Sequence, residues 1–102
     1  MSQINFLGRQ LIGAVALSGS NPLLFEKVEP ILEKTRDEFA IHAWKALKEV
    51  RSSNPVAISS FMVISGYREA TSEMVNEEII VLATRWTENN KPIDPNEVYQ
   101  SL

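Results

Sequence analysis

The chain of 102 residues has 44% hydrophobic and 23% charged residues, a net charge of −3 and no cysteine. These values are typical of one globular domain, here residues 1–102, and they exclude a disordered chain, a disulfide framework and thiolate metal sites. No apolar run reaches the roughly 20 residues that cross a bilayer, so we expect a cytoplasmic protein that does not enter the membrane.

The first apolar segment predicts a helix over residues 4–17 that ends at Ser18-Gly19. Its hydrophobic residues recur every three or four positions, which places them on one helix face. They are Ile4, Leu7, Leu11 and Val15. The run "LIGAVAL" behind Arg9 also has the outline of a secretory signal peptide. Its continuation at helical spacing favours a first core helix instead.

A second helix is predicted to begin at Pro22, behind a cap at Asn21. Its buried stripe consists of Leu24, Val28 and Leu32. Pro30 lies inside this pattern, and because proline has no N–H and its ring clashes with the preceding turn, it should kink or break the helix.

The sequence "TRDE", Thr35 to Glu38, matches a capping box. In such a box the Thr35 hydroxyl accepts from the N–H of Glu38, and the Glu38 carboxylate accepts from the N–H of Thr35. The helix that follows has one apolar face and ends at "RSSNP". That face consists of Phe39, Ala43, Ala46, Leu47 and Val50.

A fourth helix is expected to begin at Pro55 behind a cap at Ser53 or Asn54 and to close at Gly66. Its apolar residues include Val56, Phe61, Met62 and Ile64.

The fifth predicted helix is the longest and runs from Thr71 or Ser72 to about Glu88. Its stripe consists of Val75, Ile79, Leu82, Ala83 and Trp86. The β-branched run "IIVLA" within it is compatible with a strand, but the flanking segments have helical periodicity, so we interpret it as helix.

The last predicted helix begins behind Asp94, with Pro95 in its first position and Glu97 completing a second capping box. A helix of only about two turns is not stable alone in water. We therefore expect it to dock on the rest of the protein through Ile93, Val98 and Leu102. Together these segments predict an all-α fold, a compact irregular bundle of five to six short helices.

Reactive side chains are few. His42 is the single histidine, and its apolar neighbours favour a packed structural role over metal binding. Glu73, Glu77 and Glu78 lie near one another on one helix face, where solvated acids are far more common than cation sites. The sequence has no phosphate-binding glycine loop and no serine with an evident base nearby. We expect no enzyme, no cofactor and no metal.

Acidic residues are concentrated in the last third of the chain, which has seven acidic and two basic residues from Glu69 to Glu97. This asymmetry favours another protein as partner over nucleic acid. Core packing is the first expectation for Trp44 and Trp86, but Trp86 and Tyr99 also lie beside the acidic region. The candidate partner-binding residues are Trp86, Tyr99, Glu77 and Glu78. Formation of a homodimer is another way in which this protein could bury an exposed apolar helix face.

The stretch from Phe61 to Ile79 has the outline of a helix-turn-helix motif, which makes a DNA-binding transcriptional regulator the main alternative. Its candidate nucleic-acid-binding residues are Arg68, Thr71 and Ser72. The acids on the same helix would face phosphates unfavourably. A further alternative is an acidic inhibitor protein that mimics nucleic acid.

Three segments of the sequence carry a family resemblance. They are "RQLIGAVALSGSNPLLFEKVEPIL", "DEFAIHAWKALKEV" and "KPIDPNEVYQSL". In this order they resemble the first helices and the P-I-D-x-x-x-V turn of the N-terminal domain of DnaB-type replicative helicases. In that family the turn follows the third helix directly, whereas here "NPVAISSF" stands in that place. The resemblance implies a small helical module that binds replication proteins such as a primase or a helicase loader. We therefore expect a non-enzymatic protein–protein interaction module, an accessory or adaptor of phage- or plasmid-type DNA replication.

Overall fold

The computed structural model describes residues 3–17, 19 and 22–84. Within these ranges the chain is helical and contains no strand, which confirms the predicted all-α class and the helical interpretation of "IIVLA". The elements are α1 (Gln3–Leu17), α2 (Pro22–Lys34), α3 (Glu38–Val50), α4 (Pro55–Ile64), α5 (Ser72–Val75), η1 (Asn76–Ile80) and α6 (Val81–Thr84). The helix predicted behind Asp94 lies outside the described residues.

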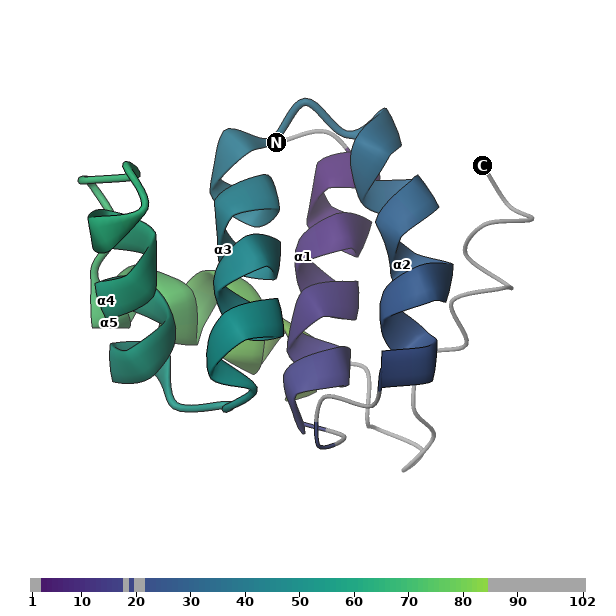
Figure 1. Cartoon of the computed structure of the whole chain (residues 1–102). Coiled ribbons are helices and arrows are strands. Elements are labelled where there is room, and N and C mark those ends of the chain that lie inside the picture. Colours follow the sequence, from purple (N-terminus) through teal and green to yellow (C-terminus); the bar gives the residue numbers. More distant parts are fainter. Residues whose placement is uncertain (1–2, 18, 20–21, 85–102) are drawn as a thin grey trace.

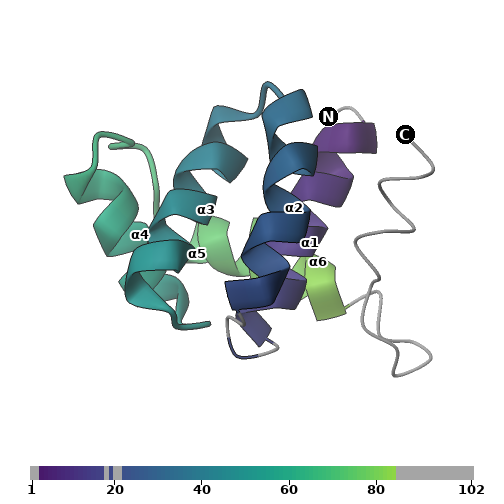
Figure 2. The same ribbon diagram turned by 45° about the vertical axis from the view of Figure 1, so that its right-hand side comes forward.

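The first four helices stand side by side in the order α4, α3, α1, α2 (Figure 1). The helical stretch of α5, η1 and α6 crosses behind them, and Figure 2 shows α6 at the foot of α1. This stretch packs against α4 at its beginning and against α1 at its end. None of the described helices has the length and apolarity needed to cross a membrane.

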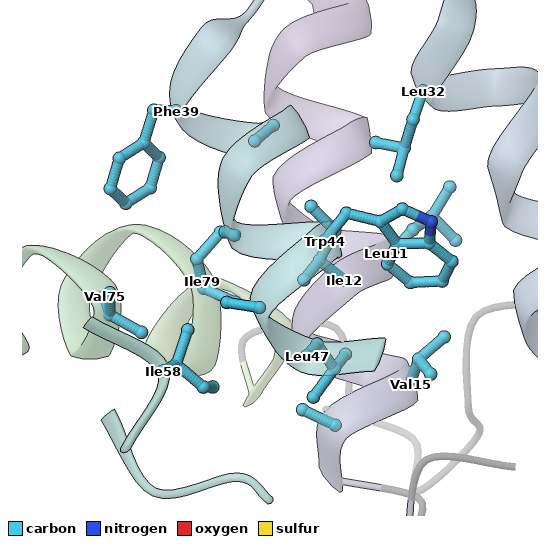
Figure 3. Close-up of a cluster of buried hydrophobic side chains, with 14 of the residues drawn as sticks. Leu11, Ile12, Val15, Leu32, Phe39, Trp44, Leu47, Ile58, Val75 and Ile79 are labelled. Carbon is cyan, nitrogen blue, oxygen red and sulfur yellow. The ribbon is translucent and has the colours of Figure 1, made fainter. Parts of the chain in front are cut away.

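The core lies where the four helices meet the crossing stretch, and Figure 3 shows side chains from all of them converging there. Leu11, Ile12 and Val15 of α1 are nearly inaccessible to solvent, as the predicted stripe requires. In α3 the predicted apolar face is buried except at Val50, which is half-buried. Trp44 is also buried, which confirms its expected place in the core.

Two of the predicted helix caps are present. The Asn54 side chain accepts a hydrogen bond from the backbone N–H of Val56 at 2.9 Å, and Pro55 occupies the first turn of α4. The Thr71 hydroxyl accepts from the N–H of Met74 at 3.1 Å and begins α5. Each side chain satisfies one of the N–H groups that a helix start leaves without an internal partner.

The predicted break at Pro30 does not occur, because α2 continues to Lys34. The proline side chain is exposed, so its ring does not disturb the packing of Val28, Ile31 and Leu32. The carbonyl that loses its N–H partner is that of Glu26, which is an exposed residue. Water can therefore replace the missing hydrogen bond.

The capping box predicted at Thr35–Glu38 is wrong. The helix begins at Glu38 behind Asp37, and no side chain caps it. The buried Thr35 hydroxyl donates instead to the carbonyl of Leu32 at 2.8 Å, at the end of α2. The Asp37 carboxylate binds Arg9 of α1. The two side chains that could have capped α3 are thus bonded elsewhere, Thr35 to the preceding helix and Asp37 to Arg9.

The stretch from Ser72 to Thr84 begins where the fifth helix was predicted, but it contains a π-helical turn, η1. The turn lies against α1 at Gly13, where an added Cβ atom would come within 2.1 Å of the carbonyl oxygen of Ile79. Val75, Ile79, Leu82 and Ala83 of the predicted stripe are all buried. The predicted continuation to Glu88 falls outside the described residues.

Candidate interaction surface

The most unusual surface of the described chain is formed by α4. Its sequence, "PVAISSFMVI", contains no charged residue. The Asn54 cap fixes its start, and its end is fixed by Gly66, whose φ of +117° suits glycine, and by the N–H of Tyr67, which donates to the carbonyl of Met62 at 2.9 Å. Both ends of α4 are therefore held, and the packing of Ile58 and Met62 in the core sets the rotation of the helix about its axis.

This rotation divides the apolar residues of α4 between two faces. Ile58, Ser59 and Met62 point into the core and are buried. Val56 is 58% exposed and Ile64 is 82% exposed. We define the outer face of α4 as Val56, Ser60, Val63 and Ile64, all exposed and all on one side at helical spacing.

A hollow of about 480 Å³ lies beside this face. Its other wall is the segment that leads into α5, so residues distant in sequence form one concavity. The hollow is lined by Val56, Ser59, Ser60, Val63, Ile64, Ala70, Thr71 and Ser72. None of these side chains is charged, and those away from the outer face are small. The surface is thus an apolar ridge, the outer face of α4, that borders a shallow, open and uncharged recess.

Two of the residues predicted for nucleic-acid binding, Thr71 and Ser72, lie in this recess, and Arg68 is exposed in the connection before it. The Thr71 hydroxyl already accepts the N–H of Met74, as described above. Seven residues, 65–71, separate α4 from α5. A helix-turn-helix motif joins its helices by a turn of about three to four residues.

The acidic residues predicted to bind a partner lie elsewhere, on η1. Glu77 is exposed. One carboxylate oxygen of Glu78 is already bonded, because its Oε2 atom accepts a hydrogen bond from Nη1 of Arg9 at 2.8 Å. The structure therefore places Glu77 and Glu78 next to each other, and Glu78 forms an ion pair with Arg9 of the same chain. Trp86 and Tyr99 lie outside the described residues, so their predicted role stays a prediction.

The Arg9 guanidinium joins three parts of the fold. It forms a two-bond contact with Asp37, from Nε at 2.6 Å and from Nη2 at 3.0 Å, and it lies 4.7 Å from the centre of the Phe39 ring. Burial acts to lower the pKa of Arg9, but the hydrogen bonds and charges of Asp37 and Glu78 outweigh it and raise the pKa. Arg9 stays charged and links α1, the start of α3 and η1.

A second, smaller hollow of about 230 Å³ lies between α2 and α3. It is lined by Glu29, Leu32, Glu33, Ile41, Trp44, Lys45 and Lys48. Glu29 forms an ion pair with Lys48 and accepts a hydrogen bond from the indole N–H of Trp44 at 3.4 Å. These contacts join α2 to α3 at the hollow.

His42 is half-buried, with its ring 5.2 Å from that of Tyr67. Its Nδ1 atom is buried and has no hydrogen-bond partner. Among the residues that the structure describes, no group of three or more His, Asp or Glu side chains is arranged to hold a metal ion. This arrangement accords with the packed role expected for His42.

Sequence reasoning did not identify the outer face of α4 as a surface. A signal was available, because a ten-residue helix without any charge has no polar side to turn toward water. Such a helix is either enclosed by its own domain or covered by something else.

No protein-family model, curated protein or solved structure matches the chain.

Proposed function

We propose that this chain is a non-enzymatic protein–protein interaction module and that the outer face of α4 is its docking surface. The observation that supports this most is the exposure of Ile64 and Val56 on a helix with no charge, beside a neutral recess. Leaving branched apolar side chains in water costs free energy that a partner can recover by covering them.

The organisation of the surface supports a specific site over scattered exposure. Val56, Val63 and Ile64 are three of the exposed large hydrophobic residues of the described chain, and they lie on one face of one helix. The others, Phe6 and Leu17, lie at opposite ends of α1. The ridge borders the shallow recess, so a partner that covers one also contacts the other.

We propose a role as an accessory or adaptor in DNA replication of the phage or plasmid type. The support is the resemblance of three segments to the N-terminal domain of DnaB-type helicases. Purified primase, replicative helicase and helicase loader from the host are therefore the first partners to test.

The test compares binding of these proteins to the immobilised wild-type chain and to two single variants. Ile64→Lys places a charge on the ridge, and Leu17→Lys places the same charge on a residue 47% exposed at the end of α1. We expect Ile64→Lys to weaken binding at least about tenfold and Leu17→Lys to leave it unchanged. Circular dichroism should show the same helical content in all three chains.

Equal binding by Ile64→Lys and wild type would overturn the proposed docking surface. Binding of duplex DNA with an affinity that falls steeply as salt rises would favour a DNA-binding regulator instead. An adaptor of the proposed kind shows no duplex binding at physiological salt.

A further inference from the structure

We draw no further inference here: the strongest candidate, the hollow between α2 and α3 that Leu32, Ile41 and Trp44 line, carries no proposal because its acidic and basic lining residues together select no one class of ligand and nothing in the structure shows what covers it.

Discussion

The helices α1 and α4 carry almost no charge but occupy different positions in the fold. Both are rich in apolar residues, and Arg9 is the single charged residue of α1, while α4 has none. Yet α1 lies between α2 and α3 with the crossing stretch against it, whereas α4 stands at the edge of the bundle (Figure 1). An apolar sequence requires that a helix be covered, but it does not specify what covers it.

The two helices also differ in how closely their neighbours approach. In α1, Gly13 lets the backbone of Ile79 come close, and Arg9 is neutralised by two acids from other elements. In α4 the inner face is packed as tightly, with Met62 and Ile58 almost inaccessible, while Val56 and Ile64 of the outer face are exposed among the residues that the structure describes. Among the described residues, α1 is therefore covered along most of its length, apart from Phe6 and Leu17, whereas α4 is covered on one side.

The largest expected effect tests the close approach at α1. Gly13→Val should destabilise the fold by about 4 kcal/mol or more, or prevent folding, because the added atoms meet backbone that cannot move aside. The measurement is urea unfolding followed by circular dichroism. Gly8→Ala in the same helix is the control, since its Cβ would meet side-chain atoms of Leu32 and Thr35 at 3.2 and 3.4 Å and no backbone. A decrease in the free energy of unfolding of Gly8→Ala as large as that of Gly13→Val would refute this explanation.

The second prediction compares two isoleucines of α4. Ile58 is 1% exposed and Ile64 is 82% exposed. Ile58→Ala should cost about 3 kcal/mol, the usual result of leaving a cavity in a core, whereas Ile64→Ala should change the stability of the monomer by less than about 0.5 kcal/mol. Thermal unfolding at low micromolar concentration measures both. Equal losses would mean that the outer face contributes to the monomer's own core.

The third prediction concerns the charge within α1. Arg9→Met keeps much of the apolar stem but leaves the Asp37 carboxylate, whose side chain is 7% exposed, without its cation. We expect a loss of about 2 kcal/mol, below the value for fully buried pairs because water reaches part of the cluster. Glu78→Gln, at a side chain 40% exposed, should cost less than about 1 kcal/mol. A larger effect at Glu78 than at Arg9 would contradict this ranking.

The smallest expected effect is the titration of Tyr67, which packs against Phe39 of α3 beyond the end of α4. Burial and the nearby charges of Glu69 and Asp37 raise the pKa of Tyr67 above its ordinary value of 10.0. The folded chain therefore keeps a proton that the unfolded chain loses, and stability should fall as pH rises above 10.

Tyr67→Phe should reduce this loss, and an ultraviolet titration of the variant should lack the ionisation that Tyr67 contributes above pH 10. An unchanged alkaline profile in the variant would show that other groups govern stability there.

Much of the fold was predictable because its signals are local. The caps at Asn54 and Thr71 require only a side chain and an N–H two or three residues away. The stripe of Val75, Ile79 and Leu82 follows from helical spacing alone, and all three are buried. Such features depend on neighbours in the sequence, so sequence reasoning can identify them.

The failures occurred where another partner, close in sequence for Thr35 and distant for Asp37 and Glu78, took the same group. Thr35 and Asp37 have side chains that can cap a helix. The Thr35 hydroxyl donates instead to the carbonyl of Leu32 in α2, and the Asp37 carboxylate binds Arg9, 28 residues away. Glu78 was expected on a free acidic surface, and it meets Arg9 across 69 residues. Spacing along the chain carries no information about the two contacts of Arg9.

The sequence by itself determined that the described chain is helical and where most of its helices begin, because capping and periodicity are short-range effects. Only the tertiary structure decided which side of α4 turns outward, since a helix apolar all round has no preferred face of its own. That orientation is set by the fit of Ile58 and Met62 against the core. It leaves Val56 and Ile64 in water, and the proposed interaction follows from that exposure.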